Sequence, residues 1–195
     1  MKIFLDTEFT GLHQYTSLLS IGLVDEDGRH FYAEISDYDF TQMDEWLLQN
    51  VMNNMLYRTN HFTAFRFSDN VDMTRSMYSS YNAQMRGPVK EVRDKLVQWL
   101  KQYDEVEIWS DCLAYDWVLF NNLFGSAFDI PKNVYYIPFD ICTMFKMKNI
   151  DPDISREKFI GDRIDNIDMP ELKKHNALWD AYVIRECYYK LIEDK

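Results

Sequence analysis

The sequence predicts an α/β fold in which a mixed β-sheet is flanked by helices. Three strand-like segments occupy the first 35 residues, and strand-like and helix-like segments alternate after Gly87. A long amphipathic segment at the C-terminal end then reads as a helix. Successive strands followed by alternating strands and helices favour a mixed sheet with helices on its faces. The length of 195 residues is typical of one compact domain, so we expect residues 1–195 to form a single domain.

The first three predicted strands are Lys2–Phe9, Leu18–Val24 and His30–Ile35. The second is a nearly continuous apolar run, which is typical of a strand buried on both faces. An acidic turn at residues 25–28 ends in Gly28 and separates it from the third, so these two strands are expected to pair antiparallel.

The remaining elements are predicted from apolar spacing and from glycine and proline positions. The helical pattern of Thr41–Tyr57 is weaker, and the aromatic, polar stretch Asn60–Tyr81 is left open between a strand-and-loop excursion and a partner surface. Beyond it we expect a helix from Gly87-Pro88 to Tyr103, a strand at Glu105–Ser110, a helix at Asp116–Phe124, a strand at Val134–Phe139, a helix at Ile141–Lys148, a surface loop at Asn149–Pro170 and a final helix at Lys174–Ile192.

Composition limits the classes of function. The net charge is −11, which is the wrong sign for a protein that coats a long nucleic-acid duplex. An acidic chain can still act on phosphates where metal ions neutralise the contact locally. We therefore expect a short piece of strand held in a pocket.

The cysteines and the N-terminal residues indicate the compartment. Cys112, Cys142 and Cys187 are odd in number and contain no Cys-x-x-Cys pair, so we expect free thiols in a reducing cytosol and no zinc site. No signal peptide and no membrane-spanning segment are visible, and the predicted location is cytoplasmic.

Two carboxylates, Asp6 and Glu8, lie at the end of the first predicted strand. Side chains two positions apart on a strand point to the same face, so these two should lie side by side. Like charges this close repel each other, and a divalent cation between them would relieve the repulsion. Taken alone, the pattern is also typical of a solvated acidic turn.

Asp116 and Asp180 complete the predicted acidic set, and His175 is the candidate proton acceptor. Five residues turn about 140° around a helix, so His175 and Asp180 cannot share a helix face. We expect His175 to precede the final helix and reach back, while Asp180 lies inside the helix and faces the sheet.

These residues resemble three motifs of the DEDDh 3′–5′ exonuclease superfamily, which includes ribonuclease T, oligoribonuclease and polymerase proofreading subunits. The motifs are Leu5-Asp6-Thr7-Glu8 through Leu12, Trp109 through Asp116, and His175 through Ala181. Trp46 and Asn50-Val51 further resemble a small bacterial and phage exoribonuclease group with a mycobacterial member. The resemblance implies the ribonuclease-H-like fold. One departure is Asp111, where many relatives carry Asn.

The resemblance also implies a chemistry and a set of roles. Two Mg²⁺ or Mn²⁺ ions would bridge the scissile phosphate, one held by Asp6, Glu8 and Asp180 and the other by Asp6 with Asp116. His175 would be the general base, and its ordinary pKa of about 6.5 suits that task. Phe9, Thr10 and Leu12 would contact the substrate, with the Leu12 side chain wedged against the terminal bases so that single-stranded ends or overhangs are preferred.

The predicted function is therefore a metal-dependent 3′–5′ exoribonuclease that releases nucleoside 5′-monophosphates from single-stranded RNA ends. A DNA exonuclease of the proofreading or trimming kind is the alternative within enzymes. A non-catalytic acidic metal-binding interaction module is the alternative from a different class.

Two further points stay open. Relatives often pair, so a homodimer is an alternative to a monomer. Positive charge gathers in the C-terminal third, and it is either a solvated face or a rim that guides phosphates. The residues concerned are Lys146, Lys148, Arg156, Lys158, Arg163, Lys173 and Lys174.

Overall fold

The structure is a computed structural model that describes residues 1–57 and 82–193. Within these ranges one sheet of six strands has the order β4-β3-β2-β1-β5-β6. The strands are β1 Lys2–Phe9, β2 Leu18–Asp25, β3 His30–Ile35, β4 Ala83–Gly87, β5 Glu107–Ser110 and β6 Phe139–Asp140. β1, β2 and β3 pair antiparallel, whereas β4, β5 and β6 join their neighbours in parallel. The predicted mixed sheet is confirmed.

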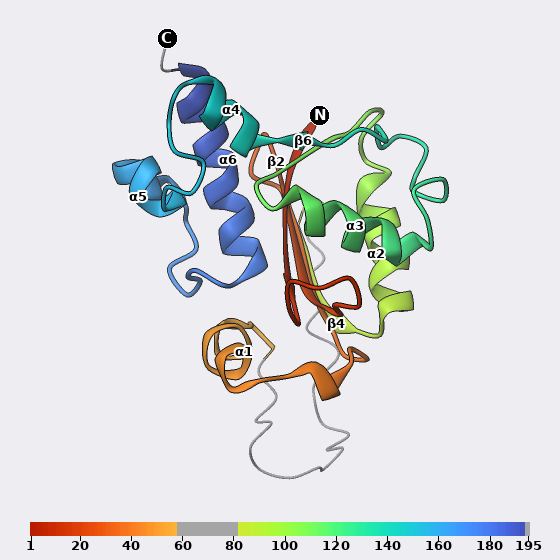
Figure 1. The fold of residues 1–195 in the computed structure, drawn as a ribbon. Coiled ribbons are helices and arrows are strands. Elements are labelled where there is room, and N and C mark those ends of the chain that lie inside the picture. The colour runs from red at the N-terminus through yellow and green to blue at the C-terminus, as the bar shows by residue number, and fades with distance from the viewer. Residues whose placement is uncertain (58–81, 194–195) are drawn as a thin grey trace.

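Helices cover both faces of the sheet (Figure 1). The α-helices in the described ranges are α1 Glu45–Asn50, α2 Val89–Leu100, α3 Leu113–Phe124, α4 Ile141–Met147, α5 Arg156–Ile160 and α6 Ala177–Glu193. Three 3₁₀ turns, η1 Phe40–Gln42, η2 Met52–Asn54 and η3 Gly161–Asn166, complete the helical elements of this part of the chain. α2 and α3 lie on one side of the sheet, and α6 with α4 and α5 lies on the other (Figure 1). No helix in the described ranges is long and apolar enough to span a membrane.

The two faces of β1 bury different cores. Ile3 and Leu5 pack with residues of α2 and α3, while Phe4 packs with residues of α4 and α6. This alternation is the period of a strand buried on both sides, so successive β1 side chains are directed to opposite layers.

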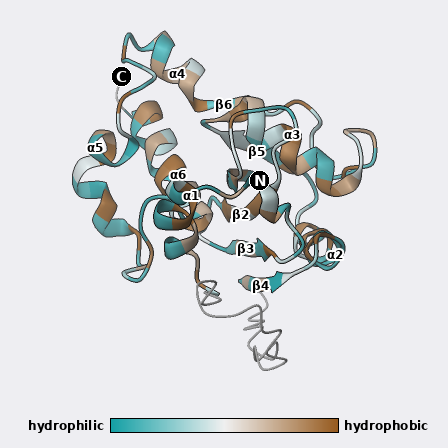
Figure 2. Cartoon of the chain, turned by 60° about the horizontal axis from the view of Figure 1, so that its bottom comes forward, coloured by the Kyte–Doolittle hydropathy of each residue, from teal (hydrophilic) through white to brown (hydrophobic). Residues whose placement is uncertain are grey.

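β4 was not predicted, because residues 36–86 carry no clear strand signal. It pairs in parallel with β3 from Phe31 to Ile35, at the edge of the sheet (Figure 2). The stretch Asn60–Tyr81, whose role the sequence left open, lies entirely outside the described residues.

The predicted helix Thr41–Tyr57 is wrong as one element. The structure divides this stretch into η1, α1 and η2. Asp39 accepts a hydrogen bond from the Thr41 backbone N–H, and Asp44 accepts one from Leu47. Aspartate is a strong N-cap, so two caps this close start two short helices instead of one long one.

The predicted strand Val134–Phe139 is also wrong over most of its length. Only Phe139 lies in β6, and Val134 forms an isolated bridge with Val106. Tyr136 and Ile137 between them are exposed, so they lack the burial on which a strand of that pattern depends.

The predicted loop Asn149–Pro170 contains α5 and η3. Ser155 caps α5 by accepting a hydrogen bond from the Lys158 backbone N–H, and Ile160 is buried against the core that includes α6. A five-residue helix lies below the length at which apolar periodicity is readable, so the sequence did not reveal it.

Gly22 of β2 sets how closely α6 approaches the sheet. It pairs with Asp6 of β1, and a Cβ atom placed on it would lie 2.2 Å from the backbone oxygen of Ala177. Only glycine allows this approach, because the added Cβ would collide with backbone atoms of Ala177, which cannot rotate away as a side chain can. The start of α6 is therefore held directly over the end of β1.

We expect Gly22→Ala to lower the free energy of unfolding by about 3 kcal/mol, because overpacking against fixed backbone forces the helix away. Urea denaturation followed by circular dichroism measures this. Gly87→Ala in β4 is the matched control, since its nearest neighbours are the flexible ends of Glu91 and Met85. Equal stability of the two variants would contradict the role of Gly22.

Candidate active site

The acidic side chains of β1 lie on the face covered by α6. The ring of Phe4, two residues before Asp6, packs against that of Tyr188 of α6 with centroids 5.3 Å apart, and the strand alternation directs Asp6 and Glu8 to the same layer. Asp180 is in the first turn of α6, which Gly22 brings close to β1. The predicted placement of Asp180 inside the final helix is confirmed.

The start of α6 is capped by a side chain. Asn176 Oδ1 accepts hydrogen bonds from the backbone N–H groups of Leu178 at 3.0 Å and Trp179 at 3.4 Å. The helix therefore begins at Ala177, three residues later than predicted. Asn176 is a typical N-cap residue, so the sequence did contain this boundary signal.

His175 precedes the helix, as predicted, in a left-handed backbone conformation with φ of 65°. Its backbone N–H donates to Asp180 Oδ2 at 2.8 Å, which connects the imidazole-bearing residue to the carboxylate. A non-glycine residue in this region is strained, so neighbouring contacts must hold it there.

Those contacts come from the segment that contains α1 and η2. Asn54 Nδ2 donates to the carbonyl oxygen of Lys174 at 2.8 Å, and Asn176 Nδ2 donates to the carbonyl oxygen of Asn54 at 2.8 Å. The Trp46 ring meets the His175 ring edge-on at 5.3 Å. One residue thus binds the chain on both sides of His175 while an indole packs on its side chain, and sequence reasoning missed these contacts.

Asp116 of α3 is fully buried and both of its oxygens are engaged. The Thr7 hydroxyl donates to Oδ1 at 2.6 Å, and the Ser110 hydroxyl donates to Oδ2. Thr7 lies between Asp6 and Glu8 on β1 and points to the opposite layer, where α3 packs. These two hydroxyls fix the carboxylate at the strand ends, and neither residue was singled out from the sequence.

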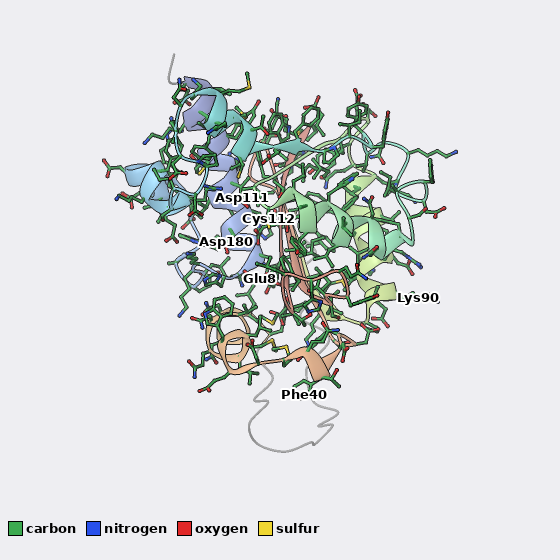
Figure 3. All side chains as sticks on the ribbon, viewed as in Figure 1. Glu8, Phe40, Lys90, Asp111, Cys112 and Asp180 are labelled. Carbon is green, nitrogen blue, oxygen red and sulfur yellow. The ribbon has the colours of Figure 1, made fainter. Side chains whose placement is uncertain are left out.

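The carboxylates converge in two groups. Oxygen atoms of Asp6, Asp111 and Asp116 lie within 4.8 Å of one another, and ligand atoms of Glu8, His175 and Asp180 do the same. Glu8, Asp111 and Asp180 are seen together between α6 and α3 in Figure 3. The structure therefore brings together all five residues that the sequence selected, and adds Asp111.

Burial and mutual repulsion oppose ionisation of these groups. Burial, followed by the charges of Asp116 and Asp180, raises the pKa of Asp6 well above its ordinary value, and burial together with Asp180 does so for Glu8. Burial likewise raises the pKa of Asp116 to about 7 and that of Asp180 to about 8. Such a set is stable in its ionised form only with compensating positive charge.

The donor set fits hard divalent cations. Carboxylate oxygens are the ligands that Mg²⁺ and Mn²⁺ prefer. Among the described residues, the two groups consist of five carboxylates and one imidazole, without a cysteine. Bound cations would also remove the repulsion that raises these pKa values.

The imidazole of His175 is neutral near pH 7. Burial, followed by the nearby Lys174 charge, lowers its pKa below the ordinary 6.5. A neutral imidazole has one free ring nitrogen, which can accept a proton or coordinate a cation.

The three predicted substrate residues differ in their surroundings. Leu12 is 74 % exposed just beyond β1, and Phe9 stacks on Tyr115 with ring centroids 5.2 Å apart. Thr10 is buried, and its hydroxyl accepts a hydrogen bond from the Ser17 backbone N–H at 2.8 Å. Leu12 is thus free to meet a ligand with its side chain, whereas the Thr10 side chain holds the loop.

A mixed sheet with helices on both faces and a carboxylate cluster at its strand ends defines an α/β nuclease domain of the ribonuclease-H-like kind. The sequence profile of the family described as a 3′–5′ exoribonuclease Rv2179c-like domain matches residues 1–191. The chain belongs to this family.

Two curated relatives carry the same description. They are the 3′–5′ exoribonucleases Rv2179c and MT2234.1 from two strains of Mycobacterium tuberculosis. Each is 26 % identical over 136 residues, which cover 69 % of this chain and 67 % of the relative. The predicted resemblance to an exoribonuclease group with a mycobacterial member is confirmed.

The raised pKa values predict how stability depends on pH without metal. The Asp180 carboxyl ionises near its ordinary pKa in the unfolded chain but only at about pH 8 in the folded one. Its stabilising contribution is therefore complete at low pH and is lost as pH rises toward 8. In EDTA we expect the free energy of unfolding to fall by roughly 1–2 kcal/mol between pH 6.5 and 8.5.

Thermal melts at several pH values measure this change. The pH window starts at 6.5 because burial lowers the pKa of His30 to about 4, which makes the stability rise with pH below 6.5. Asp180→Asn should reduce the slope, and the slope that remains is expected from Asp6, Glu8 and Asp116, whose pKa values are also raised. Mg²⁺ or Mn²⁺ should reverse it for the unsubstituted protein, because the cation favours the ionised carboxylates. A melting temperature that rises with pH in EDTA would contradict this interpretation.

Proposed function

We propose that this chain is a metal-dependent 3′–5′ exoribonuclease of the DEDDh type, formed by residues 1–195 as a single domain, which releases nucleoside 5′-monophosphates from single-stranded 3′ ends or overhangs. The observation that carries the proposal is the convergence of Asp6, Glu8, Asp116 and Asp180 beside His175. The family membership supports the reaction class and the choice of RNA.

Asp6, Glu8, Asp116 and Asp180 would hold two divalent cations. When bound, such ions polarise a phosphodiester and acidify a water molecule. Asp6 is central to this arrangement, because its carboxyl lies with Asp111 and Asp116 and also experiences the charges of Glu8 and Asp180.

His175 would act as the general base. Its backbone N–H holds Asp180, and its ring lies within reach of the Glu8 and Asp180 oxygens, so a water molecule activated there can pass its proton to the free ring nitrogen. The lowered pKa keeps that nitrogen unprotonated at neutral pH.

The exposed Leu12 would separate the terminal bases of a substrate strand. Its exposed side chain follows the last residue of β1, the same strand that carries Asp6 and Glu8, and an apolar side chain there favours unpaired ends. The net charge of −11 favours a short bound segment over a long one.

The function is tested with matched RNA and DNA oligonucleotides that carry a 5′ label and a 3′ overhang. With Mg²⁺ or Mn²⁺ we expect progressive shortening of RNA and release of nucleoside 5′-monophosphates. Asp6→Ala should abolish this, and Asp104→Ala on an exposed loop should not. Faster shortening of DNA would favour the alternative DNA exonuclease, and intact oligonucleotides with every cation would contradict the nuclease proposal.

The role of His175 is tested separately, because its ring could bind a cation instead of accepting a proton. A general base contributes about 10²–10⁴-fold to rate, so His175→Ala should reduce kcat by that factor and leave Mn²⁺ affinity almost unchanged. Isothermal titration with Mn²⁺ provides the second measurement. Loss of a bound Mn²⁺ together with activity would reassign His175 as a ligand.

A further inference from the structure

Arg156 of α5 is mostly buried and pairs with a residue of the acidic cluster. Its Nε donates to Asp111 Oδ2 at 2.8 Å, and the two side chains are each only 19 % exposed. The sequence grouped Arg156 with basic residues of a solvated face or a phosphate-guiding rim, and its surroundings fit neither of these.

Most N–H groups of the Arg156 guanidinium donate to the protein. Nη1 donates to the carbonyl oxygens of Pro152 and Ile154 at 2.8 Å each, and Nη2 donates to Cys142 Sγ at 3.1 Å. Its flat face lies 4.9 Å from the centre of the Phe145 ring. Four of about five N–H groups are thereby used, so little capacity is left to bind a substrate phosphate.

Asp111 is held on its other side as well. The Cys142 thiol donates to its carbonyl oxygen at 3.1 Å. A carboxylate oxygen of Asp111 lies within 4.8 Å of oxygens of Asp6 and Asp116, and its charge contributes to the raised pKa values of Asp6, Asp116 and Asp180. Asp111 is therefore a fifth acidic group of the site.

Five carboxylates would exceed the charge of two divalent cations even before an anionic substrate binds. Arginine stays protonated at any pH of interest, so Arg156 cancels one of these charges permanently. The five carboxylates and Arg156 together carry a net charge of about −4, which two divalent cations can balance. Removing one partner of a half-buried pair leaves the charge of the other uncompensated.

We propose that Arg156 is a positioning residue that neutralises Asp111 and so sets the cation affinity of the acidic cluster. This inference rests on the proposed function for the existence of bound cations. The pair Asp111–Arg156 is electrostatically equivalent to one neutral side chain at that position of the second motif, and it ties α5 to the end of β5.

The test compares four full-length proteins in Mn²⁺ binding without nucleic acid: the unsubstituted chain, R156M, D111N and D111N/R156M. Because R156M leaves the extra negative charge, it should tighten Mn²⁺ binding by about three- to tenfold. D111N leaves an uncompensated positive charge and should weaken binding by about the same factor. The double variant should lie within about twofold of the unsubstituted protein.

Two further variants separate charge from tethering. R156K keeps the charge but not the fork of hydrogen bonds, so its Mn²⁺ affinity should stay near that of the unsubstituted chain even if its melting temperature falls. R163M removes a cation of η3 that pairs with Glu193 and with Glu186, roughly 20 Å and 9 Å along α6 from Asp180, and should leave Mn²⁺ affinity unchanged.

A purely structural role gives a different pattern. R156M would then weaken Mn²⁺ binding, R156K would weaken it too, and D111N/R156M would be no better than the worse single variant. Any of these results would overturn the inference while leaving the nuclease proposal intact, provided that the unsubstituted protein binds Mn²⁺ and shortens RNA. Failure of the unsubstituted protein to bind Mn²⁺ would overturn both.

Discussion

The close approach of α6 to β2 at Gly22 is the constraint on which the candidate site depends. Asp6 and Asp180 are 174 positions apart in the chain, and they meet because the backbone of Ala177 lies where a side chain of β2 would otherwise be. Asp6 is the β1 residue paired with Gly22, so the contact that sets the distance between helix and sheet is also the contact nearest the carboxylates. Packing and chemistry are therefore determined at the same point.

That geometry has an electrostatic cost. Burial raises the pKa of all four predicted carboxyls, so the metal-free fold gathers charges that resist ionisation. The fold tolerates this because the strands and helices that carry the groups are held by large apolar cores on both faces of the sheet. Hydroxyls from Thr7 and Ser110 and the backbone N–H of His175 offset part of the cost at individual oxygens. Divalent cations would offset most of the rest, which is why the cluster makes physical sense as a metal site.

Local patterns predicted the parts of the structure that depend on local physics. Strands Lys2–Phe9 and His30–Ile35 coincide with β1 and β3, since apolar runs bounded by turn residues specify a buried strand directly. The set Asp6, Glu8, Asp116, His175 and Asp180 was selected because three segments of the chain resemble the motifs of a known exonuclease superfamily. What the sequence did not reveal are pairings between distant segments: the edge strand β4, the contacts of Asn54 around His175, and Arg156 on Asp111. None of these pairings leaves a periodicity or a spacing in the sequence. Asn54 and Arg156 are ordinary polar residues and β4 is a short segment, so their partners are defined only when the chain is folded.

Asp111 shows how such a distant pairing changes the meaning of a motif. Considered within its own motif, an aspartate at this position adds repulsion beside Asp6 and Asp116 and looks like a defect. With Arg156 from α5 it becomes half of a neutral pair, held also through Cys142 of α4. Because the compensating charge comes from a segment 45 positions further along the chain, the electrostatics of the cluster depend on how residues 149–172 are folded. A change in that segment would therefore alter cation binding without touching any carboxylate, and the two parts of the chain must be considered together when either is substituted.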